Sequence, residues 1–398
     1  MMKWTRVLLA GLFLCGLCYS GEAEELAVHH DKSYLIFKSG NGQYKYWLDG
    51  RIMLDYGTMD SDNDFASGWE TRRARFAIKT IIRGDWASEF DFDLADNEVE
   101  IKDFWMAYIG FNNTIIKLGN HKVPGSMEDL TTSRWTTFME RGLPNEFTIG
   151  RRIGLSYNKW GEHYSAMGGF YGQEPGTGEE EEEDEEGGYA LRAAFAPVRT
   201  ADTVLHFGFS HTNFSPDAGD NNKLRLRTRP ELHLTEKPLN TGKLKHVEDY
   251  TYTGLELAYQ KGRFSAQAEY LEAKLNRSKG EDASYSGYYA YVSWFAFGAQ
   301  RTYNMDSGEF GAIRPQGKKG ALEFAFRVSN IDLNDFDAEV EGGSADNITF
   351  GVNWYANDNV KIVLNYIQSD LDEYADGDGD FLGGDKLDIL ALRFQYLF

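Results

Sequence analysis

The residues of this 398-residue chain with the clearest chemical potential are two groups of closely spaced cations. Between Glu70 and Asp85 there is no acid and there are five basic residues: Arg72, Arg73, Arg75, Lys79 and Arg83. Farther along, Arg225, Arg227 and Arg229 recur at every second position, so an extended backbone would project all three to one side. A guanidinium group suits phosphate because its planar fork donates two hydrogen bonds and keeps its charge at any working pH. These groups predict a path for anions.

Such rows need strands to hold them, and several segments alternate apolar and polar residues as strands do. The pattern is clearest at residues 387–398, which end on the aromatic Phe398, and it recurs at 46–56, 89–94, 255–270 and 322–328. Within the first cationic group, Arg73, Arg75 and Lys79 share the face opposite Ala74, Phe76 and Ile78.

A cation facing lipid at the bilayer midplane costs about 2 to 4 kcal/mol, so we expect the Arg73 row to face a lumen. There it would either guide anions or pair with lumen carboxylates and brace the wall.

Short connections alternate with long polar ones, as in barrels that have short periplasmic turns and long external loops. Counting strands back from Phe398 predicts an all-β, transmembrane, antiparallel barrel of 16 strands. Residues 300–319 make an unusually long turn, and if they hide two more strands the count becomes 18. The long connections are predicted at residues 57–69, 120–149, 172–188, 211–249, 276–286, 331–346 and 370–386.

The N-terminus has the features of a secretory signal peptide, predicted at residues 1–20. Lys3 and Arg6 precede an apolar run, and Ser20 offers a cleavage site. We expect residues 21–43 to form a periplasmic segment and residues 44–398 to form the barrel. Both cysteines, Cys15 and Cys18, lie in the signal, so the mature chain would have neither a disulfide nor a thiolate metal site.

The charge balance limits the possible partners. Removal of Lys3 and Arg6 with the signal would change the net charge from −21 to −23, which argues against nucleic acid. The run Glu179 to Glu186 is predicted to be a solvated external loop. No spacing indicates a metal or cofactor site, and the eight histidines show no catalytic arrangement with a serine and an acid. We therefore do not expect an enzyme.

From Glu70 to Phe398, an ordered series of motifs resembles the phosphate- and polyphosphate-selective porin family (porins O and P). The matching stretches are Glu70-Thr-Arg-Arg-Ala-Arg-Phe76, Gly84-Asp-Trp86, His121-Lys-Val-Pro-Gly-Ser-Met-Glu-Asp-Leu-Thr-Thr-Ser-Arg134, Thr137-Phe-Met-Glu-Arg-Gly-Leu-Pro144, Gly150-Arg-Arg-Ile-Gly154, Leu224-Arg-Leu-Arg-Thr-Arg-Pro-Glu231, Gly351-Val-Asn-Trp-Tyr355 and the closing strand.

The resemblance implies a homotrimeric barrel whose third external loop folds inward to narrow the pore. It places Lys122, Ser126 and Arg134 at a central anion site. Arg72 and Arg73, with Arg225, Arg227 and Arg229, would form a ladder leading to it. Two positions depart from the family pattern: Gly125 replaces an aromatic residue and Val123 replaces an acid, changes expected to widen or retune the pore.

The leading hypothesis is a passive outer-membrane channel that prefers anions such as phosphate or polyphosphate. The expected partners are outer-membrane lipid, lipopolysaccharide, small anions, two further copies of the chain, and the barrel-assembly machinery through Phe398. One alternative is a general or cation-preferring porin whose lumen is dominated by Asp49, Asp55, Asp91 and Asp93. Another is a structural or adhesive barrel without a transport role.

Overall fold

The computed structural model describes residues 26–31, 34–95, 98–175, 187–216 and 223–398. The predicted signal peptide and the acidic run from Glu179 to Glu186 lie outside these ranges. No described helix is both long enough and apolar enough to cross a membrane.

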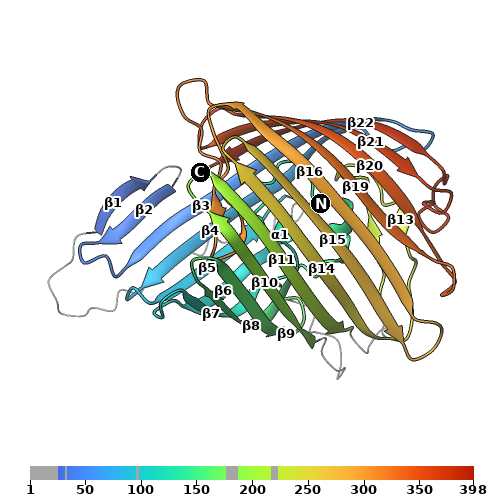
Figure 1. Ribbon diagram of the computed structural model, residues 1–398, viewed down its shortest axis with the longest axis horizontal. Coiled ribbons are helices and arrows are strands. Elements are labelled where there is room, and N and C mark those ends of the chain that lie inside the picture. Colours follow the sequence, from blue (N-terminus) through green and yellow to red (C-terminus); the bar gives the residue numbers. More distant parts are fainter. Residues whose placement is uncertain (1–25, 32–33, 96–97, 176–186, 217–222) are drawn as a thin grey trace, which may run out of the picture.

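Sixteen antiparallel strands close into a barrel, which confirms the predicted fold class (Figure 1). Each strand pairs with the next along the chain, and β22 pairs with β3 to close the wall. The barrel strands are β3 (Lys45–Asp60), β4 (Gly68–Ile82), β5 (Trp86–Asp93), β6 (Glu100–Tyr108), β7 (Thr114–Lys122), β8 (Arg151–Trp160), β9 (Tyr164–Tyr171), β10 (Gly187–Arg199), β11 (Thr203–Ser215), β14 (Val247–Lys261), β15 (Phe264–Arg277), β16 (Ala283–Phe297), β19 (Ala321–Asp335), β20 (Val340–Tyr355), β21 (Val360–Leu371) and β22 (Lys386–Leu397).

The C-terminal residue takes part in the closure. The register runs from Asp388 opposite Asp60 to Leu397 opposite Arg51. Beyond it, the Phe398 amide donates to the Gly50 carbonyl at 3.1 Å, and the Gly50 amide donates to the Phe398 carbonyl at 2.8 Å. A Cβ at position 50 would lie 2.2 Å from the Phe398 ring, so this close approach requires glycine. We call this end of the barrel, where the tight turns also lie, the short-turn end.

Alternation sorts the side chains of each strand between the two faces of the wall. On β22, Arg393 and Gln395 are buried inside while Phe394 and Tyr396 are exposed outside, as the pattern predicts. The strands also extend beyond the outer apolar band, where Asp332 and Asp346 occupy the outer face. For this reason the predicted long connection at 331–346 is wrong: only residues 336–339 separate β19 from β20.

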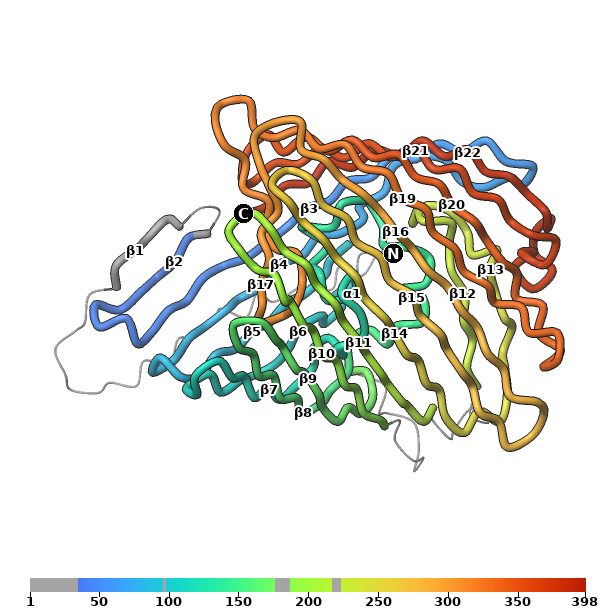
Figure 2. Tube along the Cα trace, viewed as in Figure 1, coloured from blue at the N-terminus to red at the C-terminus, as the bar shows by residue number. Residues whose placement is uncertain are grey.

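Two short hairpins lie outside the barrel ladder. β1 (Leu26–Asp31) and β2 (Tyr34–Ser39) pair with each other, and β2 extends the sheet by pairing with the start of β3. Residues 300–319, which we call the inward turn, contain β17 (Tyr303–Asn304) and β18 (Glu309–Phe310). These strands pair only with each other, so the barrel has 16 strands rather than the alternative 18. Figure 2 traces the inward turn and labels β17 within it.

Two external segments fold into the lumen from the other end. The constriction loop, residues 123–150, carries helix α1 (Met127–Leu130) and the 3-10 helix η1 (Leu143–Phe147). The arginine loop, residues 223–246, carries β12 (Arg227–Thr228) and β13 (Leu239–Asn240). From the short-turn end, Phe310 of the inward turn packs against Met127 of α1, so the segments meet inside the barrel.

A hydrophobic core fills the lumen on the β14–β22 side. There the inward positions near the external end are apolar, which departs from the polar lumen of an open channel. Phe147 of the constriction loop and Leu232 of the arginine loop pack among wall residues such as Tyr252, Leu271 and Ile331. The core therefore fixes both loops to one wall and leaves the opposite wall free to line a cavity.

Candidate functional site

The central cavity lies against the β3–β9 wall and has a volume of about 610 Å³. Its remaining sides come from the constriction loop and the inward turn. Basic residues outnumber acids nine to seven among its lining side chains. The basic residues are Arg51, Arg73, Arg75, Lys79, Lys117, Lys122, Arg134, Arg141 and Arg151, and the acids are Asp49, Glu89, Asp91, Asp103, Asp129, Asp306 and Glu309.

A second, outer cavity of about 230 Å³ lies between the constriction loop and the arginine loop. It shares Arg73, Asp129 and Arg141 with the central cavity, so these three side chains stand where the two spaces adjoin. Arg229 and Lys237 line it as well. An ion entering from the external end would thus pass cationic side chains before it reaches the central cavity.

Arg134 reaches the β3–β9 wall from the constriction loop. Its guanidinium donates to Asp49 at 2.8 Å and forms a second, parallel contact with the other oxygen of the same carboxylate. Lys79 of β4 lies 2.8 Å from the same carboxylate and 3.0 Å from Glu89. The backbone carbonyl of Arg134 accepts a hydrogen bond from Gln395 at 3.3 Å. The predicted central arginine therefore faces the cavity, with its fork occupied by a carboxylate.

A β-bulge turns two neighbouring arginines of β4 inward. Strict alternation would send Arg72 to the outer face, but the register shifts between the Met53–Arg73 and Leu54–Thr71 pairs. Arg72 donates two hydrogen bonds to Glu140 of the constriction loop, at 2.9 and 3.0 Å, and Arg73 lies 3.8 Å from the same carboxylate.

Glu140 also accepts from Arg393 at 2.7 Å. Burial raises the pKa of the Glu140 carboxyl, but the three neighbouring arginines outweigh burial and hold the pKa well below its usual range. The carboxylate thus stays charged and ties the loop to the wall.

The other predicted central residues serve the constriction loop itself. Lys122 donates to the Asp129 carbonyl and lies 3.8 Å from the Asp129 carboxylate. Ser126 caps α1 by accepting a hydrogen bond from the Asp129 amide at 2.9 Å, and it lines neither cavity. Gly125 does not leave an open space, because a Cβ there would lie 2.0 Å from the hydroxyl of Tyr252. Tyr252 therefore fills the space at this position, and Val123, two residues earlier, is fully buried.

The three arginines of the arginine loop make different contacts. Arg229 lines the outer cavity and donates to the Thr235 carbonyl at 2.6 Å. Arg225 donates to Asn240 at 2.7 Å, and it and Arg227 line neither cavity. Leu226, which lies between Arg225 and Arg227, packs in the hydrophobic core and holds this segment in place.

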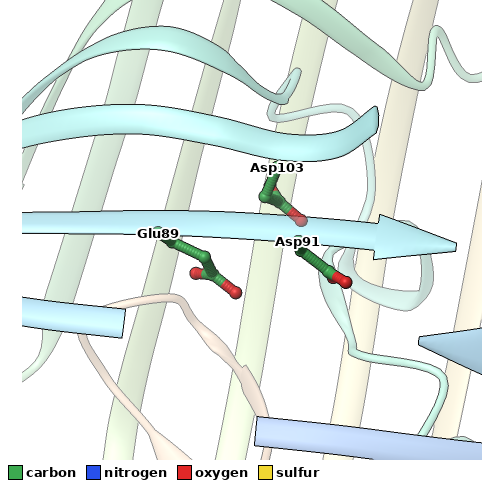
Figure 3. Close-up of side chains that lie close together, drawn as sticks. All are labelled: Glu89, Asp91 and Asp103. Carbon is green, nitrogen blue, oxygen red and sulfur yellow. The ribbon is translucent and has the colours of Figure 1, made fainter. Parts of the chain in front are cut away.

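Three carboxylates stand close together on the cavity wall: Glu89 and Asp91 on β5 and Asp103 on β6 (Figure 3). Each has an oxygen within 4.8 Å of the others. Each also has a cation beside it: Lys79 lies 3.0 Å from Glu89, Arg75 3.7 Å from Asp91, and Arg151 2.7 Å from Asp103. The group is thus a charge-paired part of the wall.

Sequence reasoning missed several lining cations. Arg51, Lys117, Arg141 and Arg151 were not assigned to the cavity, because they lie far apart in the sequence and only the closed barrel and its constriction loop bring them together. Arg141 donates to the carbonyls of Glu128, Asp129 and Thr131, which holds α1 in position. Among the described residues, Arg51 and Lys117 are lining cations that form no ion pair. If strand alternation had been used to assign every basic residue to the inner or outer face, Arg51 and Lys117 would both have been placed inside.

Two partly buried acids of the inward segments have raised pKa values. Burial raises the pKa of Glu146, in η1, to about 7, although a hydrogen bond from the Arg227 amide and the charge of Lys237 act in the opposite direction. Burial likewise raises the pKa of Glu309, in β18, to about 7, against the charges of Lys122 and Arg192. Glu146 lines the outer cavity and Glu309 the central one, so the charge of both cavities depends on pH.

A closed barrel with apolar strand faces outside and charged cavities inside defines an outer-membrane channel of the porin class. The chain belongs to the family described as phosphate-selective porin O and P, whose model matches residues 47–398.

Among curated proteins, Porin O of Pseudomonas aeruginosa is 27% identical and aligns with 96% of this chain and 97% of its own length. An uncharacterized protein of Caulobacter vibrioides is 29% identical over 83% of this chain and 69% of its own length.

The fold is shared with solved structures of low sequence identity. The anion-selective porin from Comamonas acidovorans superposes with a TM-score of 0.56 at 14% identity, covering 89% of this chain and all of that one. Salmonella typhi OmpF gives a TM-score of 0.58 at 14% identity, covering 90% of this chain and 99% of that one. The trimer form of Vibrio cholerae OmpT gives 0.58 at 10% identity, covering 89% and 99%. Family and fold together place the protein in the outer membrane of a Gram-negative-type bacterium as a channel.

Proposed function

We propose that this channel conducts anions in preference to cations and binds phosphate or a related oxyanion transiently in the central cavity. The observation that carries the proposal is the excess of basic over acidic side chains around that cavity, in a chain whose net charge is −21. The acids of the chain thus concentrate elsewhere. A lumen potential of the opposite sign to the whole protein attracts anions at short range, since salt screens the distant charges within about 10 Å.

The cavity suits passage better than tight binding. Most of its cations already hold carboxylates, so none offers a deep site, and a permeating ion must be released as easily as it is bound. Under this proposal Lys122, Arg134, Arg73 and Arg75 act in the central cavity and Arg72 and Arg229 in the outer one. Ser126, Arg225 and Arg227 would act indirectly, by shaping the two loops.

The same proposal includes the assembly of the protein. Residues 1–20 would be removed as a signal peptide, residues 21–43 would lie in the periplasm at the short-turn end, and residues 44–398 would form the barrel. Three copies would form a trimer surrounded by lipid and lipopolysaccharide, inserted by the barrel-assembly machinery acting on Phe398. No enzymatic role is proposed.

The general-porin alternative is favoured by the same ion pairs, because a neutralised lumen need not discriminate between ions. A planar bilayer with a KCl gradient separates the two functions. We expect the reversal potential to lie toward the equilibrium potential of chloride, and we expect millimolar phosphate to block part of the current. A reversal potential on the potassium side at neutral pH, without block, would contradict the proposed anion preference.

Arg134→Ala tests the central site. Loss of the guanidinium should remove the phosphate block while leaving the pore conducting, because Gln395 contacts only the backbone of residue 134. The matched control is Arg263→Ala, which removes an equal charge from an exposed turn. Unchanged phosphate block in Arg134→Ala would show that the central site lies elsewhere.

A further inference from the structure

Asp49 of β3 occupies an unusual position on the wall of the central cavity. It is 2% exposed, yet it lines the cavity and contacts two of its cations. Arg134 approaches from the constriction loop with two parallel contacts, and Lys79 approaches along the wall at 2.8 Å. The carboxylate therefore links the loop to the wall through charge.

The two cations do not depend on Asp49 equally. Lys79 has a second carboxylate in Glu89, at 3.0 Å, and so keeps a partner if Asp49 is neutralised. Arg134 directs its fork at Asp49, and Asp49 is the acid with which the described structure pairs it. The geometry of that pair, two parallel N–H···O contacts, is also the geometry in which guanidinium binds an oxyanion.

We propose that Asp49 is a specificity-determining residue: its carboxylate is the internal competitor that a permeating oxyanion must displace from Arg134. The inference deepens the proposed function and rests on it for the passage of anions. While the oxyanion holds Arg134, Lys79 retains Asp49, so the displaced carboxylate is not left buried without a partner. Exchange of one anion for another on the same fork keeps binding weak and release fast, as conduction requires.

A purely structural role for Asp49, anchoring the loop, makes a different prediction. That part of the constriction loop has other attachments: Arg51 donates to Thr132 at 3.0 Å and Gln395 to the carbonyl of Arg134. Lys361 donates to the Thr136 carbonyl at 2.7 Å. An anchoring role would therefore affect gating noise rather than the affinity for an oxyanion.

The test is block of chloride current by inorganic phosphate in single channels of the full-length protein. We expect Asp49→Asn to lower the half-blocking phosphate concentration by about tenfold, through slower release, because the Arg134 fork loses its competitor. Asp49→Glu, which restores a carboxylate, should stay within about threefold of the natural protein. Asp49→Asn combined with Arg134→Ala should show no block.

The matched control is Asp55→Asn, which removes a buried lumen carboxylate from the same strand. Asp55 pairs with Arg393 at 2.6 and 2.7 Å, and Arg393 retains Glu140. An equal fall in half-blocking concentration in both Asn variants, or no fall in either, would overturn the proposal, since it would show a general charge effect or none. If Asp49→Asn does not insert into membranes, Asp49→Ser serves as the neutral variant under the same criteria.

This outcome is separable from the proposed function. Ion preference is read from the reversal potential of the natural protein, whereas the role of Asp49 is read from the change in phosphate block. Cation preference in the natural protein, with phosphate block appearing in Asp49→Asn, would refute the proposed function and support the role of Asp49. Anion preference in the natural protein, with phosphate block unaltered by Asp49→Asn, would support the proposed function and refute the role of Asp49.

Discussion

The two halves of the barrel interior use the same strand alternation for different purposes. On the β3–β9 side, the inward positions carry charged residues such as Asp49, Arg75 and Lys79, which line the central cavity. On the β14–β22 side, inward residues such as Leu271 and Ile331 form a hydrophobic core with the two external loops. Alternation alone therefore does not define a lumen. One part of the inner wall can pack against loops in a hydrophobic core, while the rest lines a solvated cavity.

This division explains how a narrow pore keeps its shape. Loops carry unsatisfied backbone groups and are mobile unless they pack against a scaffold. Here the apolar wall holds the constriction loop and the arginine loop, while Glu140, at the boundary, links the loop to Arg72, Arg73 and Arg393. The charged residues of the opposite wall share in the anchoring, through pairs such as Arg134 with Asp49, and they also line the central cavity.

The largest expected effect comes from disrupting the hydrophobic core that holds the two external loops. Phe147 is fully buried in the core, and its truncation to Ala should weaken docking of the loops by about 3 to 5 kcal/mol. We expect a larger and noisier single-channel conductance and faster protease cleavage within residues 123–150. Phe147→Leu, which keeps most of the volume, is the control. Natural conductance in Phe147→Ala would show that the core does not hold the constriction.

A smaller effect, on ion selectivity, should follow from titrating the acids that line the two cavities. Glu146 and Glu309, with pKa values raised to about 7, are neutral below that pH and negatively charged above it. A unit negative charge about 8 Å away raises the energy of an anion and lowers that of a cation by about 0.5 kcal/mol each in a water-like dielectric, so the chloride-to-potassium permeability ratio should fall severalfold from pH 6 to pH 8.

Reversal potentials across that pH range measure the effect. The double variant Glu146→Gln with Glu309→Gln should lose most of this pH dependence. A ratio in the natural protein that rises with pH would contradict the assignment of these two acids.

The smallest effect is expected outside both regions. Lys386 forms a 2.8 Å ion pair with Asp370 on the outer wall, but its side chain is 77% exposed. Exposed pairs contribute little, so Lys386→Ala should alter thermal stability by less than about 1 kcal/mol and leave ion selectivity unchanged. A thermal melt with bilayer conductance checks this, and a shift comparable to that of Phe147→Ala would undermine the contrast drawn between interior and exterior.

The sequence by itself predicted the barrel and the inward direction of Arg73, Arg75 and Arg393, but it left the strand count open between 16 and 18. Each of these follows from local alternation, because a strand side chain faces inside or outside according to its parity. The ordered motifs also identified the family. Alternation is interrupted at a β-bulge, and Arg72 faces inward because of such a bulge in the β3–β4 pairing.

Only the tertiary structure decided which cation meets which acid. Arg134 and Asp49 are 85 residues apart, and Arg393 and Glu140 are 253 apart. Strand register and the folding of three segments into the lumen bring these partners together, and neither leaves a local pattern. The same holds for the hydrophobic core, since residues such as Leu271 look lumen-facing until the loops that cover them are placed. Spacing along the chain sets the face of a charge, whereas long-range packing sets its partner.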